Sequence, residues 1–196
     1  YPCLNVVVTP MLEPWKLYLE GRLYLNRQQL EQAKSAFEQV LKIDPNFKKA
    51  YQFLGKIQKF FDEKGQAIVY YQNYLVVNPH DIAAIQELVE VHEQLGEVDK
   101  AEGVLLQGLK NNPDDPVLIR DLAEIRVANG RGAEALHEYL KLADDVRQQP
   151  MVLFGMGIAF QNCGNYIAAK TCYQNVLTAQ PKHRQALNNL LVLELD

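Results

Sequence analysis

Five alanines recur along the chain at a constant interval of 34 residues, at Ala33, Ala67, Ala101, Ala135 and Ala169. Prolines keep the same interval at Pro45, Pro79, Pro113 and Pro181, and Arg147 occupies the one remaining place in that column. A fixed period of this length indicates a repeat architecture, in which each unit stacks on its neighbours. The chain is therefore predicted to be an array, which is more typical of a binding surface than of an enzyme.

Each 34-residue unit contains two apolar stretches with the three- and four-residue spacing of an α-helix. Gly96, Gly130 and Gly164 lie between the two stretches of later units, where glycine can end a helix in the left-handed conformation. Each proline then bars helical angles for the residue before it. The sequence thus predicts an all-α fold of antiparallel helix–turn–helix units.

The alanine register also sets the domain boundaries. The five repeats are predicted at residues 14–47, 48–81, 82–115, 116–149 and 150–183. Residues 184–196 are predicted as the first helix of a partial sixth repeat or as a capping helix, in which Leu187, Leu190 and Leu191 pack on the fifth repeat and Leu193 and Leu195 point elsewhere. Because the fourth repeat lacks its proline, its second helix is expected to run longer or to end irregularly.

Residues 1–13 stand outside the repeat. Residues 6–9 are strand-prone, and the prolines on either side are expected to bar a helix. We expect this segment either to lie extended in the groove or against the first unit, as an internal ligand, or to be a linker or the edge of a preceding domain.

Small residues recur on the first helix of each unit, where they let the two helix axes approach closely: Gly21, Gly55, Val89, Ala123 and Gly157. Larger residues recur on the second helix, where we expect them to fill the space against the next unit: Phe37, Tyr71, Leu105, Tyr139 and Tyr173.

These columns resemble the tetratricopeptide repeat, a family with a 34-residue helix–turn–helix unit. The second and fifth units match it best, at Tyr51, Leu54, Gly55, Ala67, Tyr71 and Pro79, and at Leu153, Gly157, Phe160, Ala169, Tyr173 and Pro181. The first unit departs at Glu20, where the family has a large apolar residue. The resemblance covers residues 14–196 and implies an α-solenoid of about five repeats in a right-handed superhelix.

The resemblance also implies a concave groove, lined by the first helices, that holds a peptide or helix of a partner. Mapped onto this chain, the predicted groove residues are Arg22, Lys49, Gln52, Lys56, Lys59, Glu90, Glu93, Arg120, Glu124, Met151, Phe154 and Ile158. They do not match the carboxylate clamp of chaperone-binding members, because the corresponding places hold Tyr18, Arg22, Phe53, Ala83 and Glu87.

Two parts of this lining lead to sharper hypotheses, each with a plain alternative. Lys49, Lys56 and Lys59 either meet an acidic partner segment or form a solvated basic face. Met151, Phe154 and Ile158 either form an apolar seat for a partner helix or strand, or are covered by a neighbouring helix or by the end of the chain.

Other classes of function find little support. The net charge of −4, with −7 concentrated in residues 82–149, disfavours nucleic-acid binding. Cys3, Cys163 and Cys172 have no metal-ligand spacing, and we expect Cys163 and Cys172 to be buried thiols. No phosphate loop, GxSxG or HExxH motif is present, so we expect no enzyme, cofactor or metal site. No apolar run is long enough for membrane insertion.

The sequence therefore predicts a protein–protein interaction scaffold within a larger assembly. The alternative is a non-catalytic regulatory or substrate-presenting domain of a larger enzyme or of a secretion or cell-envelope machine. The apolar helix at 184–196 leaves two interpretations open, a fragment of a longer protein or a homodimer in which a second copy covers that helix. The odd cysteine count favours a reducing compartment such as the cytoplasm, and the periplasm and cell envelope stay open.

Overall fold

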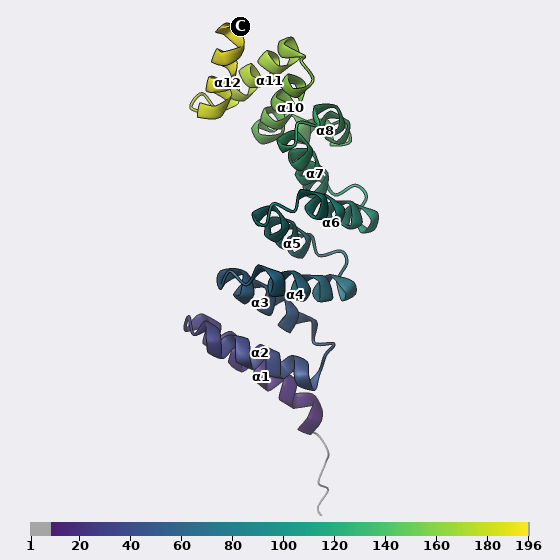
Figure 1. Ribbon diagram of the computed structural model, residues 1–196, viewed down its shortest axis with the longest axis vertical. Coiled ribbons are helices and arrows are strands. Elements are labelled where there is room, and N and C mark those ends of the chain that lie inside the picture. The colour runs from purple at the N-terminus through teal and green to yellow at the C-terminus, as the bar shows by residue number, and fades with distance from the viewer. Residues whose placement is uncertain (1–8, 196) are drawn as a thin grey trace, which may run out of the picture. The chain divides into compact units, whose positions relative to one another are not determined.

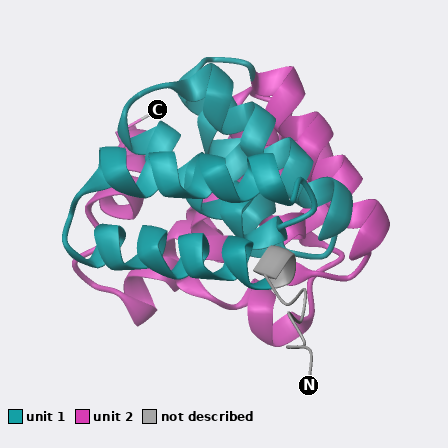
Figure 2. Cartoon of the chain, turned by 90° about the horizontal axis from the view of Figure 1, so that it is seen from below, with its two compact units in different colours: residues 1–97 teal, residues 98–196 magenta. Residues whose placement is uncertain are grey.

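The computed structural model of the chain describes residues 9–195, and over these residues it contains twelve α-helices and no β-strand (Figure 1). The predicted all-α fold is confirmed. The chain divides into two compact units, residues 1–97 and residues 98–196 (Figure 2). The division falls after Glu97, between the two helices of the third predicted repeat.

Unit 1 contains five helices, α1 (Thr9–Asn26), α2 (Leu30–Ile43), α3 (Lys48–Phe60), α4 (Lys64–Val77) and α5 (Ile82–Gln94). Helices α1 and α2 form one hairpin and α3 and α4 a second, while α2 packs on α3 and α4 on α5. The core is rich in aromatic side chains, with Tyr18, Phe37 and Phe47 buried beside Leu54 and Ile57. Each hairpin therefore buries the apolar face that its neighbour leaves bare.

Unit 2 contains seven helices, α6 (Val98–Asn111), α7 (Pro116–Ala128), α8 (Gly132–Tyr139), α9 (Asp144–Arg147), α10 (Pro150–Asn162), α11 (Tyr166–Ala179) and α12 (Arg184–Leu195). Helices α7 and α8 form one hairpin and α10 and α11 another, with α12 packed on α11. The alanine column lies in the cores of both units, since all five members have no exposed surface.

One backbone conformation recurs at the turn between the two helices of every predicted repeat. Gly96, Gly130 and Gly164 have φ of 71°, 72° and 73°, as the sequence predicts. The first two hairpins place Gln28 at φ 59° and Asp62 at φ 61° in the same column, 34 residues apart. Turn geometry is thus uniform although only three of the five residues are glycine, because the helix ends dictate the left-handed residue.

The large side chains of the second helices pack inside their own hairpin as well as against the next repeat. A Cβ atom on Gly55 would lie 2.9 Å from Cζ of Tyr71, and one on Gly157 would lie 2.5 Å from Cε1 of Tyr173. Each ring therefore lies over the glycine of its own hairpin. Each tyrosine also reaches the following repeat, as predicted, because the Tyr71 hydroxyl donates to Glu87 of α5 at 3.3 Å and the Tyr173 hydroxyl accepts a hydrogen bond from α12 at 3.3 Å. The glycine surface leaves room there for an aromatic ring.

The fourth repeat is the exception. Its first helix has Ala123 in the small column, and the Tyr139 hydroxyl lies instead where a Cβ on Gly155 of the following helix would be. Helix α8 ends after eight residues and the four-residue helix α9 follows. The irregular ending predicted from the missing proline is confirmed, and Arg147 stabilises it by donating to the Leu140 carbonyl at 3.0 Å.

Two predictions near the N-terminus and the α10–α11 turn need correction. Helix α1 begins at Thr9 and contains Pro10 in its first turn, so this flanking proline does not bar a helix there. A proline in the first turn removes only an N–H that has no partner within the helix. Residues 6–8 and Cys3 lie outside the described residues. Cys172 is buried as expected, whereas Cys163 is exposed because it caps the end of α10 beside the turn.

The leucines that α12 buries also differ from those predicted. Leu190 and Leu193 are buried with Ala186, whereas Leu187 and Leu191 are exposed. Positions 186, 190 and 193 share one face of an α-helix, and that face packs on the preceding hairpin. The prediction is therefore correct for Leu190 and Leu195 and wrong for the other three leucines.

The contact of ring and glycine leads to a stability prediction. Replacing Gly55 with alanine pushes the new methyl group into the Tyr71 ring, so we expect the free energy of unfolding to fall by about 1–3 kcal/mol. Gly103 is the matched control, because a Cβ there meets nothing within 4 Å. Gly103→Ala should stabilise α6 by about 0.5–1 kcal/mol through helix propensity. Urea denaturation of both variants measures the difference, and equal effects would refute the proposed packing.

Candidate protein-binding site

The predicted groove residues all lie on the first helices of their predicted repeats. Unit 1 carries those on α1, α3 and α5, namely Arg22, Lys49, Gln52, Lys56, Lys59, Glu90 and Glu93. Unit 2 carries those on α7 and α10, namely Arg120, Glu124, Met151, Phe154 and Ile158. The two sets belong to separate units and are described separately.

The Lys59 side chain forms ion pairs inside unit 1. Its ammonium group pairs with Glu87 at 2.8 Å and also with Glu90, both on α5. Burial disfavours the charged form, but the hydrogen bonds and charges of the two carboxylates outweigh it and raise the pKa of Lys59 above 10.5. The hydroxyl of Tyr71 donates to the same Glu87 at 3.3 Å. Lys59 therefore joins α3 to α5.

The other two predicted lysines differ from Lys59 and from each other. The Lys49 ammonium lies 5.6 Å from the centroid of the Trp15 ring, which is the geometry of a cation–π contact. Lys56 is exposed, and within residues 9–195 no ion pair is found for it. The structure thus divides the predicted basic cluster into one ion-paired lysine, one exposed lysine over an aromatic ring, and one exposed lysine for which no ion pair is found among residues 9–195.

Lys56 borders a pocket within unit 1. The pocket has a volume of about 540 Å³ and is lined by Leu25, Gln28, Leu30, Phe53, Lys56, Ile57 and Phe60. The end of α1, the turn after it and the start of α2 form one wall, and α3 forms the other. Phe60 stands at its edge with 74% of its surface exposed.

Sequence reasoning places Lys56 in the binding surface but misses most of the pocket. Phe53, Lys56, Ile57 and Phe60 have the spacing of a single helix face, which was a usable signal. Nothing in the sequence pattern shows that the turn residue Gln28 and its neighbours Leu25 and Leu30 face them, because that depends on how the first two hairpins pack.

In unit 2 the predicted apolar seat is largely filled by the chain itself. The Phe154 ring lies 5.9 Å from the ring of Tyr173 and 4.8 Å from that of His183. Ile158 packs against two core clusters. Met151 is 58% exposed and is the open member of the three. Arg120 donates to Asp121 at 2.8 Å and pairs with Glu124 at 3.6 Å, so these predicted residues contact each other.

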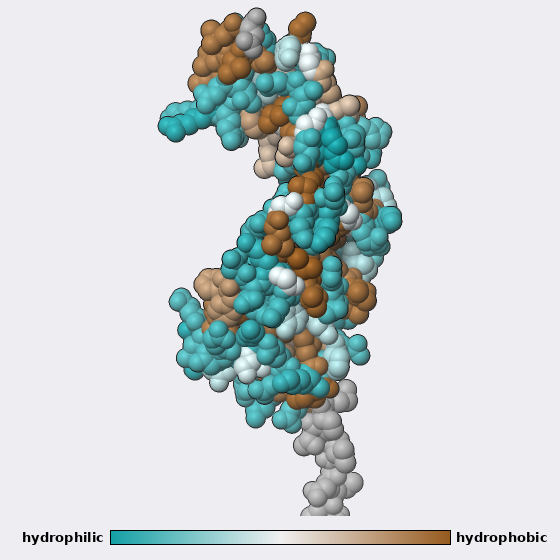
Figure 3. Space-filling view, in the orientation of Figure 1, coloured by the Kyte–Doolittle hydropathy of each residue, from teal (hydrophilic) through white to brown (hydrophobic). Residues whose placement is uncertain are grey.

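A second exposed apolar area lies on α12. Figure 3 shows a brown, hydrophobic patch over the last turns of this helix. The exposed side chains there are Leu187, Leu191, Val192 and Leu195, the last with 87% of its surface accessible. Large exposed apolar patches commonly mark interaction surfaces.

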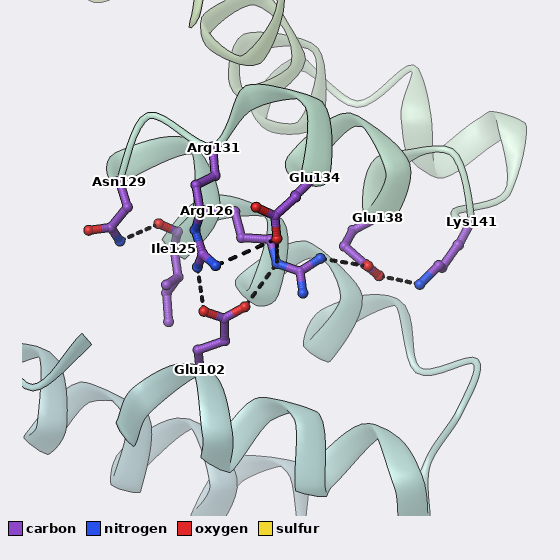
Figure 4. A network of polar contacts seen from close by, with 8 residues as sticks. All are labelled: Glu102, Ile125, Arg126, Asn129, Arg131, Glu134, Glu138 and Lys141. Carbon is purple, nitrogen blue, oxygen red and sulfur yellow. Dashed lines mark hydrogen bonds and ion pairs between the residues drawn. The ribbon is translucent and has the colours of Figure 1, made fainter. Parts of the chain in front are cut away.

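The most buried charged cluster of unit 2 is a structural network (Figure 4). Arg126 donates to Glu102 at 3.0 Å and to Glu138 at 2.8 Å, and Arg131 also pairs with Glu102. Lys141 donates to Glu138 at 2.6 Å. Both carboxylates are therefore fully paired, and the cluster links α6, α7 and α8. No group of side chains suited to a metal ion occurs among residues 9–195.

Burial would raise the pKa of Glu102, but the hydrogen bonds and charges of Arg131 and Arg126 outweigh it and hold the pKa below the ordinary value of 4.5. In the part of the chain that the structure describes, no helix is both long and apolar enough to cross a membrane.

Comparison with known proteins agrees with the repeat pattern. Models of the tetratricopeptide repeat match residues 14–47, 65–118 and 152–183, which together span more than half of the chain. The chain belongs to the tetratricopeptide repeat family. The resemblance drawn from the residue columns is confirmed. Protein–protein interaction is the general role of this family, and its members are typically non-catalytic.

Solved structures share the fold. The chain is similar to a tetratricopeptide repeat protein from Parabacteroides merdae, at 16% identity and a TM-score of 0.79 over 93% of this chain and 73% of that one. It is also similar to YrrB, at 17% identity and a TM-score of 0.73 over 88% of this chain and 89% of YrrB. The similarity to MamA is 20% identity and a TM-score of 0.73 over 88% of this chain and 95% of MamA. Identities this low show the tetratricopeptide solenoid fold alone. No curated protein sequence matches the chain.

The charged network leads to a prediction of pH dependence. Because the pKa of Glu102 is lowered in the folded state, its contribution to stability is present above pH 4.5 and is lost as the pH falls through the native pKa. We expect Glu102→Gln to lower the free energy of unfolding by about 1.5–3 kcal/mol at pH 7, from the loss of charged hydrogen bonds. The difference from the unmodified chain should shrink at pH 3. Urea denaturation at both pH values measures it, and a constant difference would contradict this role.

Proposed function

We propose that this chain is a protein-interaction scaffold, without catalysis of its own, that holds a peptide or helix of a partner within a larger assembly. The observation that carries the proposal is the open apolar pocket of unit 1, bordered by the exposed side chains of Lys56 and Phe60. Pockets with apolar walls and a few polar groups are the usual form of binding sites. The general role of the family supports the same conclusion.

A similar structure gives further support for a peptide as the ligand. YrrB, which has the same fold, is described as having an unusual peptide-binding site. In this chain the faces open to such a ligand are those of α3 in unit 1 and of α10 in unit 2, where Lys56 and Met151 are exposed. These two residues are better probes than Lys59 and Phe154, because the latter two contribute to internal packing.

We also propose that α12 mediates self-association through a second copy of the chain. Its exposed leucines, Leu187, Leu191 and Leu195, recur every four residues and so form one continuous apolar row. A row of this kind can pack against a helix of another molecule. This proposal concerns assembly and is independent of the partner site.

The scaffold function is tested by affinity capture with the purified chain as bait. We expect a protein partner to be retained by the unmodified chain and lost with either Lys56→Glu or Met151→Asp, which locates the site in unit 1 or unit 2. Lys42→Glu is the matched control, since Lys42 is an exposed lysine on the second helix α2. Circular dichroism verifies that all variants are folded. Equal capture by every variant would remove both faces as the site.

Self-association is tested by multi-angle light scattering over a range of concentrations. We expect the mass to rise with concentration towards that of a dimer, and Leu191→Asp to keep the chain monomeric because it interrupts the apolar row. Val69→Asp, at an exposed valine on α4, is the control and should leave the mass curve unchanged. A monomer at all concentrations would refute the role of α12.

A further inference from the structure

The pocket of unit 1 is large enough to admit a bulky side chain and has mostly apolar walls. Its volume of about 540 Å³ lies within the range of roughly 300–1,000 Å³ that is usual for ligand sites. Five of its seven lining residues are aliphatic or aromatic: Leu25, Leu30, Phe53, Ile57 and Phe60. An aliphatic or aromatic side chain entering it would therefore replace contact with water by contact with apolar walls.

The walls are held in place by the core of unit 1. The Phe53 ring stacks on Phe37 with centroids 5.1 Å apart and planes 7° from parallel. The Phe60 ring meets the edge of Phe61 at 6.0 Å, and Phe61 packs against the core cluster. The Phe53 wall is thus supported from behind by the core, so this wall would lose little conformational freedom when a ligand binds.

The charge at the rim favours a negative neighbour for that side chain. Helix α3 contains four lysines and no carboxylate. Three of the four have partners inside unit 1, because Lys48 donates to the Val77 carbonyl at 3.5 Å, Lys49 lies over Trp15 and Lys59 pairs with Glu87 and Glu90.

Lys56 differs from the other three. Like Lys48 and Lys49 it is exposed, but it is the one of the four that lines the pocket, and no ion pair is found for it among the residues that the structure describes. The second polar group of the pocket, Gln28, is uncharged. A carboxylate of a ligand beside the pocket could therefore approach Lys56 and gain a charge-assisted hydrogen bond.

We infer that the pocket binds an acidic peptide segment through one large apolar side chain, with an adjacent aspartate or glutamate of that peptide held by Lys56. This inference rests on the proposed scaffold function and specifies its partner chemistry. Residues 1–8 of the chain itself fit this description poorly, because they contain no carboxylate side chain. The pocket supplies the apolar contact, and the lysine selects the charge beside it.

Fluorescence anisotropy with a matched set of synthetic ten-residue peptides tests the inference. Each labelled peptide has a central phenylalanine, leucine or alanine, flanked by glutamate, glutamine or lysine in an otherwise glycine and serine sequence. We expect the peptides with phenylalanine or leucine beside glutamate to bind best. Replacing the central residue with alanine, or the flanking glutamates with lysines, should weaken binding about tenfold.

Two variants of the chain assign these preferences to the pocket. Lys56→Glu should reverse the flank preference from glutamate to lysine while the preference for a large central residue stays. Phe60→Ala should weaken binding of every peptide about fivefold or more without changing the flank preference. Both residues have exposed side chains, and Lys42→Glu serves as the matched control that leaves all affinities unchanged. Thermal melts verify that the variants are folded.

The outcomes separate this inference from the scaffold function. If no peptide binds, or if Lys56→Glu leaves the flank preference unchanged, the inference is wrong even where a partner is captured from a lysate, and the scaffold function stands on that capture. A preference for lysine-flanked peptides by the unmodified chain would likewise overturn it. If peptide binding follows both variants as stated while lysate capture is indifferent to Lys56, the pocket assignment holds and the captured partner uses another surface.

Discussion

The packing of an aromatic ring over a bare stretch of helix backbone is the contact on which the hairpins depend. In the first, second and fifth repeats, a Phe or Tyr from the second helix occupies the space that a Cβ on a glycine of the first helix would take. Two helices can then lie close together while a large side chain is still fully buried between them. Because the contact lies within a hairpin, it makes each hairpin a unit that can stack on others, and the alanine column completes the fit.

Much of the fold could be predicted from the sequence because it depends on short-range pattern. The alanines, prolines and glycines mark helix positions and helix ends, and the structure has its helices there. The features that were predicted wrongly or not at all depend on how the helices pack against one another. Gln28 and Asp62 adopt positive φ because the ends of the two helices require it, although neither residue type by itself predicts a left-handed conformation. The Leu193 side chain is buried because the 186, 190 and 193 face of α12 packs inward, which requires knowledge of the rotation of that helix.

The site was predictable as a set of helix faces but not as a set of contacts. Placing Lys49, Lys56 and Lys59 on α3 follows from spacing alone. Their different roles follow from neighbours supplied by α1 and α5, namely Trp15 for Lys49 and the carboxylates Glu87 and Glu90 for Lys59. The sequence suggests one shared basic surface, but Lys49 and Lys59 each interact with partners inside unit 1. In unit 2 the Phe154 ring likewise packs inside the unit, against the rings of Tyr173 and His183.

The stacking of Phe53 on Phe37 has a consequence for how such a protein can diversify. Phe53 lines the pocket, and Phe37 is the ring that lies over Gly21, so this wall of the pocket is held by the same ring that packs inside the first hairpin. Lys56 and Phe60 line the rim of the pocket with exposed side chains and do not take part in the contact between Phe37 and Gly21. Substitutions at the rim can therefore change what the pocket binds with little loss of stability, whereas a substitution of Phe53 would also disturb the packing of the first hairpin.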